Sequence, residues 1–231
     1  MTVRRQPPDS STGPPELVGG TADDGSTRKP SKGDLTAQAI LDTAEHLLAN
    51  RSLGEIGIDE LAAGAGVSRS TFYFHFESRD DVLYTLSDRL IGEIYAEGLV
   101  WFRRGDEEPV AAVRRALTRM VELWRAHGPV LRASVRGRET DPRLAELWSE
   151  IARRFMRSTA VQIESERNAG LALPGPPSAR GLARALVIMN EATCYQQTLM
   201  KKSAAWDEEL VESLTAIWVR SIYGDAVKLT P

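Results

Sequence analysis

Residues 56–81 read IGIDELAAGAGVSRSTFYFHFESRDD, and this stretch predicts two short helices joined by a tight turn. Gly57 is expected to be the N-cap of the first helix, ahead of acidic residues and of apolar residues at helical spacing. Gly64 and Gly66 supply the backbone freedom that a sharp turn needs. Ser68 is expected to cap a second helix that carries small hydroxyls and aromatic rings. The pattern is typical of a helix-turn-helix, which sets its second helix into the major groove of DNA.

The second helix has an alternative interpretation as a strand, because Phe72, Phe74 and Phe76 alternate along the sequence. In a helix, Phe72 and Phe76 share one face, four residues apart. The side chains expected to be less buried are then Thr71, Tyr73 and His75. A strand would need a partner, and no alternating run or hairpin turn lies nearby, so the sequence favours the helix.

Apolar residues recur at helical spacing through the rest of the chain, which predicts an all-α fold of about nine helices. Ser78 is expected to open a long helix, with Asp81 as its capping-box partner. The other expected helices run from Asp34 to Asn50, from Pro109 to His127, from Pro129 onward, from Pro142 to Gly170, from Ser178 to Leu199 and from Asp207 onward. Residues 33–80 should therefore form a helix-turn-helix domain and residues 81–231 a larger helical domain, with the helix after Ser78 connecting them.

Residues 1–32 are rich in Pro, Gly, Ser and charge and carry almost no large apolar side chains, so a disordered leader is expected. Arg28, Lys29 and Lys32 lie just ahead of the first expected helix. Two interpretations stay open for these residues: a basic arm that reaches DNA, or a solvated leader.

The composition is that of a soluble globular protein, with 42% hydrophobic and 26% charged residues among 231. No apolar run is long enough to cross a membrane, and the N-terminus lacks the apolar region of a signal peptide. The single cysteine, Cys194, excludes an intramolecular disulfide framework and fits a reducing cytoplasm. A net charge of −3 does not exclude DNA binding, which depends on a local basic face.

Motifs for catalysis are missing from the sequence, so neither an enzyme nor a bound cofactor is expected. His46, His75 and His127 have no neighbours at metal-ligand spacing. No nucleophile elbow, P-loop or dinucleotide fingerprint occurs, and the glycines of GAG belong to the predicted turn. Cys194, in an apolar helix, is interpreted as a small core residue.

The sequence resembles the TetR family of transcriptional regulators, in which a helix-turn-helix is followed by a TFYxHF-like run, a serine, a basic residue and acidic residues. Here that pattern is STFYFHF-ESRDD. Further motifs shared with one branch of the family are A-E-x-L-L at 44–48, LAxGAG at 61–66, AELWS at 145–149, LxxMNE at 186–191 and IWVxSIYG at 217–224. The resemblance covers about residues 35–224 and implies a DNA-binding regulator.

The expected DNA contacts lie on and next to the second helix of the motif. They are Ser68, Arg69, Ser70, Thr71, Tyr73, His75 and Arg79. Hydroxyl groups there can bond phosphates or base edges. The resemblance implies that Thr71, Tyr73 and His75 face DNA and that Arg79, where the family usually has lysine, binds phosphate. The alternative for Tyr73 and His75 is packing between helices.

The second domain carries aromatic side chains on several core-facing stripes, and Asn190 interrupts an apolar run. A buried amide must be hydrogen-bonded to protein, water or ligand. Composition alone favours a solid aromatic core with one satisfied asparagine over a ligand cavity. The resemblance implies the opposite, namely a tunnel for hydrophobic ligands.

The expected ligand-binding residues follow from that resemblance. They are Val113, Leu117, Met120, Trp124, Trp148, Phe155, Thr159, Val187, Asn190, Glu191, Tyr195 and Trp218. The related branch has tryptophans where this chain has Val113 and Phe155, an asparagine in place of Val187 and a tyrosine in place of Ser158. The tunnel should therefore persist with an altered shape and altered polar contacts.

These features together predict a ligand-responsive repressor that binds a near-palindromic operator as a homodimer. The dimer is expected to form through residues 179–199 and 207–223, and the last helix carries Leu214, Ile217 and Ile222 on one stripe with Trp218. The alternatives are a DNA-binding regulator without an effector, an activator, or a small-molecule-binding or enzymatic protein that kept the fold. A second open point concerns three arginines, which are either solvated or tie the short sixth helix to the DNA-binding unit: Arg132, Arg136 and Arg138.

Overall fold

The computed structural model describes residues 31–98, 107–200 and 203–224. These residues form nine α-helices and one short 3-10 helix, with no strand among them, which confirms the all-α prediction. The α-helices are α1 (Lys32–Leu48), α2 (Ile58–Gly64), α3 (Arg69–His75), α4 (Arg79–Gly98), α5 (Pro109–Ala126), α6 (Gly128–Gly137), α7 (Pro142–Asn168), α8 (Ala179–Leu199) and α9 (Ala204–Tyr223), and the 3-10 helix η1 is Leu53–Glu55. Residues 1–30 of the expected leader, with Arg28 and Lys29, lie outside the described residues.

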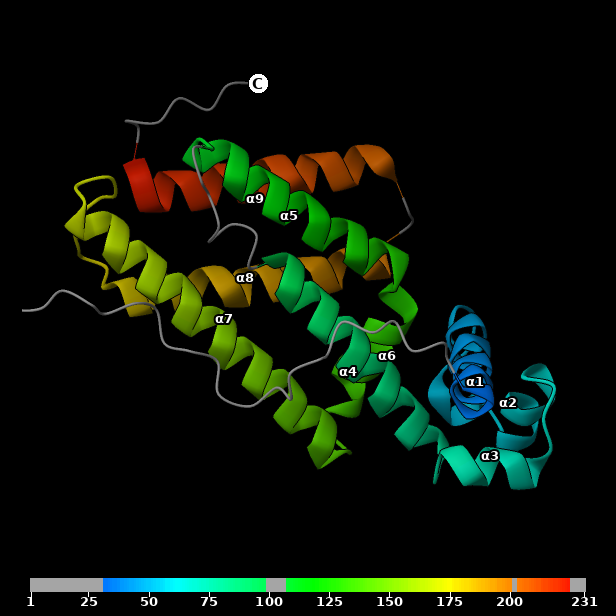
Figure 1. Ribbon diagram of the computed structural model, residues 1–231. Coiled ribbons are helices and arrows are strands. Elements are labelled where there is room, and N and C mark those ends of the chain that lie inside the picture. Colours follow the sequence, from blue (N-terminus) through cyan, green and yellow to red (C-terminus); the bar gives the residue numbers. More distant parts are fainter. Residues whose placement is uncertain (1–30, 99–106, 201–202, 225–231) are drawn as a thin grey trace, which may run out of the picture.

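The helices form two groups that α4 connects (Figure 1). Helices α1, α2 and α3 lie together at one end of the molecule, and α5, α7, α8 and α9 build the larger body. Helix α4 packs against α1 on one side and against α5, α6 and α7 on the other. Movement of α4 relative to the larger body would therefore also move the first three helices.

The turn between α2 and α3 has the predicted geometry. Gly57 is the N-cap of α2, and its N–H donates to the Glu60 carboxylate at 3.0 Å. A hydrogen bond from Arg51 and this backbone contact hold the pKa of Glu60 at about 2. Gly66 has a φ of +68°, which L side chains rarely adopt, and Ser68 Oγ accepts the N–H of Thr71 at 3.1 Å. The helix-turn-helix is confirmed.

Several helix limits differ from the prediction because side chains cap the ends differently. Helix α1 begins at Lys32, two residues before the expected start at Asp34, because Ser31 and Asp34 form a capping box. Lys32 therefore belongs to the helix and does not, as the sequence had indicated, lie ahead of it. It ends at Leu48, not at Asn50. Helix α9 begins three residues before Asp207, whose N–H already donates to the carbonyl of Ser203.

At the start of α4, Ser78 Oγ accepts the N–H of Asp81 at 3.1 Å, as expected for a cap. The Asp81 carboxylate, however, accepts the N–H of Glu77 at 3.2 Å instead of the N–H of Ser78. The reciprocal bond of the predicted capping box is therefore shifted by one residue.

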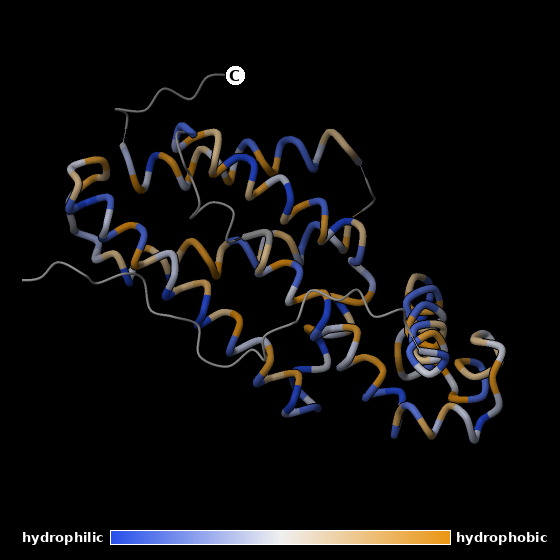
Figure 2. The backbone as a smooth tube through the Cα atoms, in the orientation of Figure 1, coloured by the Kyte–Doolittle hydropathy of each residue, from blue (hydrophilic) through white to orange (hydrophobic). Residues whose placement is uncertain are grey.

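Buried apolar side chains form one core around α1–α4 and the adjoining ends of the larger body, and a second core among α5, α7, α8 and α9. Hydrophobic residues recur along each of these helices between hydrophilic ones (Figure 2). The expected stripe of the last helix has an inward and an outward part: Leu214 and Trp218 are buried, whereas Ile217 is 43% exposed. With 3.6 residues per turn, Ile217 lies about 100° around α9 from Trp218, which carries it out of the stripe.

Candidate functional site

Hydroxyl groups gather at the exposed start of α3. Ser68 Oγ lies 2.8 Å from Ser70 Oγ and 2.8 Å from Thr71 Oγ1. Ser68 and Ser70 are exposed, and Thr71 is half-buried. These hydroxyls can each donate and accept, so their mutual contacts leave hydrogen-bonding capacity for phosphates and base edges.

Arg69 and Tyr73 form a second exposed group, one turn apart on α3. The Arg69 guanidinium donates to both oxygens of Asp59 at 2.9 Å and to the Tyr73 hydroxyl at 3.3 Å. Its carbon Cζ lies 5.6 Å from the centre of the Tyr73 ring, and these contacts, first that with Tyr73, raise the pKa of Arg69. The network fixes the orientation of Tyr73, whose exposed fraction is 46%.

His75 and Arg79 are more enclosed than the residues at the start of α3. His75 is half-buried, and its ring lies beside Gly33 at the start of α1. The Arg79 guanidinium donates to the carbonyls of Gly54 at 3.0 Å and Ile56 at 3.3 Å. Arg79 thus braces the chain between η1 and α2 while its other nitrogens keep donor capacity.

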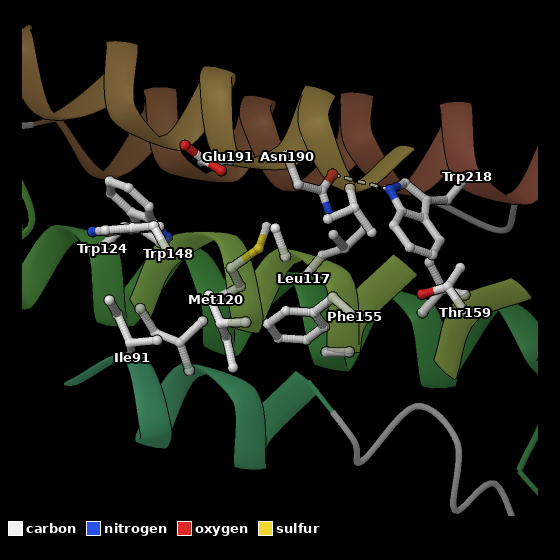
Figure 3. Close-up of a pocket in the computed structure, with 16 residues that line it drawn as sticks. Ile91, Leu117, Met120, Trp124, Trp148, Phe155, Thr159, Asn190, Glu191 and Trp218 are labelled. Carbon is white, nitrogen blue, oxygen red and sulfur yellow. Dashed lines mark hydrogen bonds between the residues drawn. The ribbon is translucent and has the colours of Figure 1, made fainter. Parts of the chain in front are cut away.

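The larger body contains a cavity of about 100 Å³ between α4, α5, α7, α8 and α9 (Figure 3). Its lining residues are Ile91, Ile94, Val113, Ala116, Leu117, Met120, Trp124, Trp148, Ile151, Ala152, Phe155, Thr159, Val187, Asn190, Glu191 and Trp218. Every expected ligand-binding residue except Tyr195 lines it. Helix α8 passes the cavity between Val187 and Glu191, so Tyr195, one turn further on, packs against the neighbouring core instead.

Sequence reasoning missed the wall that α4 contributes. Ile91 and Ile94 line the cavity from α4, and Ala116, Ile151 and Ala152 complete the lining from α5 and α7. The available signal was the apolar spacing along α4, which marks a buried face without indicating what that face contacts.

Asn190 is the main polar group at one end of the cavity. The residue is 9% exposed, and its Oδ1 accepts the indole N–H of Trp218 at 3.0 Å, the dashed line in Figure 3. Among the described residues, the amide nitrogen of Asn190 donates no hydrogen bond. Because Asn190 Oδ1 accepts the indole N–H of Trp218, the two N–H groups of the Asn190 amide remain as donors for an acceptor in the cavity.

The other end of the cavity is formed by Trp124 and Trp148, whose ring centres are 6.0 Å apart. The Trp148 indole N–H donates to Ser134 Oγ at 2.8 Å. Arg138 lies over the Trp148 ring, with Cζ 5.0 Å from its centre, and pairs with the Glu191 carboxylate at 2.8 Å. At this end the Arg138–Glu191 ion pair therefore lies against the Trp148 ring.

The suggestion that arginines of α6 tie it to the DNA-binding unit was wrong. Arg138 pairs with Glu191 of α8, and Arg132 donates to the carbonyl of Thr198, also on α8, at 2.6 Å. Arg136 is exposed. The polar contact with α1 comes instead from His127, at the N-cap of α6, whose Nδ1 lies 2.5 Å from a Glu45 oxygen.

Cys194 is a core residue, as predicted. It is 1% exposed, and burial raises the pKa of its thiol to about 12, so it stays protonated near neutral pH. Among residues 31–98, 107–200 and 203–224, no group of three His, Cys, Asp or Glu side chains is placed to hold a metal ion. Nor does any helix in those ranges have the length and apolar character needed to span a membrane.

The exposed polar face of α3 on a helix-turn-helix, joined to a larger helical body with a cavity, defines a DNA-binding regulator. Residues 40–84 match the family described as "Bacterial regulatory proteins, tetR family". Residues 113–224 match "Transcriptional regulator EthR, C-terminal domain". The chain belongs to the TetR family of transcriptional regulators, and the relatives it matches are regulators and not enzymes.

Two relatives are similar over most of their length. The HTH-type transcriptional regulator EthR of Mycobacterium tuberculosis (strain H37Rv) is 38% identical over 200 residues, covering 86% of this chain and 92% of the relative. EthR of Mycolicibacterium smegmatis is 36% identical over 196 residues, covering 85% and 89%. The similarity thus includes both the helix-turn-helix and the larger body.

Solved structures share the fold at lower identity. A putative TetR-family regulator from Mesorhizobium loti has a TM-score of 0.65 at 16% identity, covering 84% of this chain and 100% of that chain. A putative transcriptional regulator from Saccharomonospora viridis in complex with choline has a TM-score of 0.63 at 21% identity, covering 80% and 96%.

Proposed function

We propose that this regulator represses transcription as a homodimer on a near-palindromic operator and leaves it when a small hydrophobic molecule occupies the cavity. The observation that carries the proposal is that α4 forms part of the cavity wall through Ile91 and Ile94 and also packs against α1. In this proposal residues 33–80 bind DNA, while residues 81–231 bind the ligand and form the dimer. Such a regulator would act in the cytoplasm, where its operator is.

The size of the cavity supports coupling between ligand and helix position. At about 100 Å³ it is smaller than the roughly 300–1,000 Å³ of sites for drug-sized ligands. A drug-sized ligand that lies wholly inside the cavity would therefore displace part of its wall, and α4 is one side of that wall. The two recognition helices of a dimer must be about 34–36 Å apart to enter successive major grooves. A coupling free energy of about 1–3 kcal/mol between ligand and DNA would change operator occupancy substantially.

Polar contacts join α4 to α1 on one side and to α7 on the other. Arg89 of α4 donates to the Gln38 side chain of α1 at 2.9 Å. Near the start of α4, Asp81 pairs with Arg143 of α7 at 3.1 Å. A shift of α4 at the cavity would have to carry α1 with it or break the bond between Arg89 and Gln38.

The proposed dimer interface is the outer face of α8 and α9. Ile188 on α8 and Ile217 and Trp206 on α9 have exposed fractions of 43–48%. Small residues on the same face of α8, Ala185 and Ala192, are also exposed and would allow close approach of a partner helix. Two such pairs related by a two-fold axis form a four-helix bundle.

DNA binding is tested with Thr71→Ala and Tyr73→Ala, using DNA that flanks the gene. Each variant should weaken sequence-specific binding by about 1.5–3 kcal/mol per half-site, the range for a hydrogen bond to a charged group. Fluorescence anisotropy at several salt concentrations measures this, and wild-type affinity should fall steeply with salt. Val161→Ala, at an exposed site on α7, serves as the control. If both variants bind with wild-type affinity and the affinity does not depend on salt, the α3 surface is not the DNA-binding face.

Ligand binding is tested with long-chain alkyl ketones or ethers, which combine an apolar body with one acceptor. At a hundredfold excess over Kd, such a ligand should raise the free energy of unfolding by about 2.7 kcal/mol and release the operator. Asn190→Leu should weaken ketone binding more than binding of the matching alkane, because only the ketone loses a hydrogen bond.

Asn190→Leu also leaves the Trp218 indole without its acceptor. The double variant Asn190→Leu/Trp218→Phe removes both polar partners and controls for that effect. Thermal melting and anisotropy report binding and release separately. The effector part of the proposal is refuted if no such ligand stabilises the wild type, or if stabilising ligands leave operator affinity unchanged.

A further inference from the structure

Phe74 stands out among the large apolar side chains of the described residues because 84% of its surface is exposed, the highest fraction of any. The phenylalanines two positions before and after it, Phe72 and Phe76, are 0% and 6% exposed and hold α3 onto its own core. Phe74 therefore contributes little to that core. An exposed aromatic ring in the middle of a recognition surface indicates an apolar partner in the complex.

The neighbours of Phe74 keep the ring in the polar contact face of α3. Ser70 lies one helical turn before it on the same face, and Tyr73 is held beside it by Arg69. The His75 ring lies against it in a T-shaped contact, with ring centres 5.2 Å apart and planes at 84°. In Figure 1, α3 lies at the outer end of the helix-turn-helix unit, away from the larger body.

The apolar character of the Phe74 ring limits which groups of DNA it can contact. Phe74 has no hydrogen-bonding group, so it can neither bind phosphate nor pair with the polar atoms of base edges. In the major groove the C5-methyl group of thymine is the apolar feature that a base pair presents, and phenylalanine is among the side chains that contact it. We propose that Phe74 reads a thymine in each operator half-site through its C5-methyl group, an inference that rests on the proposed operator binding.

The expected effect follows from the burial of one methyl group. Burying a methylene-sized group changes an equilibrium constant by about fourfold. Loss of the methyl group in both half-sites should therefore weaken binding of the dimer by about 16-fold. The effect should be confined to one thymine position in each half-site.

The test replaces thymine by deoxyuridine, which keeps Watson–Crick pairing and lacks only the methyl group. Half-sites are first located by footprinting of the wild-type protein on its flanking DNA, and each thymine is then replaced in turn. Wild type should lose about fourfold in affinity at one position per half-site. Phe74→Ala should bind the thymine operator as weakly as wild type binds an operator with deoxyuridine at that position in both half-sites, about 16-fold more weakly than wild type binds thymine, and it should not distinguish the two operators. Val161→Ala, the exposed-site control, should retain the wild-type discrimination.

The inference is overturned if Phe74→Ala keeps the thymine preference of the wild type, or if wild type tolerates deoxyuridine at every position. If Phe74→Ala lowers affinity by the same factor on the thymine and deoxyuridine operators, so that the ratio of the two affinities stays as in wild type, the ring makes another contact and the inference is also overturned. If wild type shows no sequence-specific binding, the proposed operator binding fails first, and this inference fails with it.

Discussion

The double substitution Ile188→Glu/Ile217→Glu is expected to convert a dimer into a monomer and to weaken operator binding by about 10²–10⁴-fold, the usual gain from linking two binding modules. Both isoleucines are exposed on the outer faces of α8 and α9. In a two-fold symmetric interface each introduced carboxylate faces the same patch on the partner, so like charges meet and are taken out of water.

Sedimentation velocity at micromolar concentration measures the assembly, and anisotropy measures operator binding. Val161→Glu places the same charge at a site on α7 that is 66% exposed, and it should leave both assembly and binding unchanged. A double variant that still sediments as a dimer, or a wild-type protein that is monomeric, would show that this face is not the interface.

Replacement of the buried ring of α3 by Phe72→Ala is expected to lower the free energy of unfolding of the helix-turn-helix by about 3–5 kcal/mol. Phe72 is fully buried, and its ring packs against Tyr73 and Phe76 at centre-to-centre distances of 5.6 and 6.0 Å. The truncation leaves a cavity between α3 and its core, so α3 should lose its fixed position and operator binding should fall with it.

Phe74→Ala is the matched control because it removes the same ring two residues away from an exposed site. Its effect on the free energy of unfolding should stay within about 0.5 kcal/mol, as is usual for surface substitutions. Urea unfolding followed by circular dichroism compares the two variants. Equal losses of stability would mean that Phe72 and Phe74 do not differ in burial as described.

The fold class and most helix starts were open to prediction because the interactions that set them are local. Helix α7 begins after Asp141, whose carboxylate accepts the N–H of Arg143 at 2.8 Å, and α8 begins after Ser178, whose Oγ accepts the N–H of Gly181 at 3.2 Å. Both bonds span two or three residues, so the sequence displays each donor and acceptor together. Helix α9 lacks a side-chain cap bond at Ser203, and its start was placed three residues too late.

The candidate site was only partly open to prediction. Resemblance to the TetR family supplied the residues of α5, α7, α8 and α9 that line the cavity. It did not supply Ile91 and Ile94, and it included Tyr195, which does not line the cavity. Helical spacing marks these side chains as inward-facing, but whether an inward side chain meets a cavity or solid packing depends on how helices far apart in sequence are placed.

The sequence by itself determined where α3 forms and that Phe72 and Phe76 hold it, because a four-residue spacing fixes one face of any α-helix. Only the tertiary structure decided that α4 is a wall of the cavity, that Arg138 pairs with Glu191 across 53 positions of the chain, and that Ile217 faces outward. The physical reason is that these relations depend on the packing of whole helices against one another, and that packing sums many weak contacts between distant segments which no local pattern records.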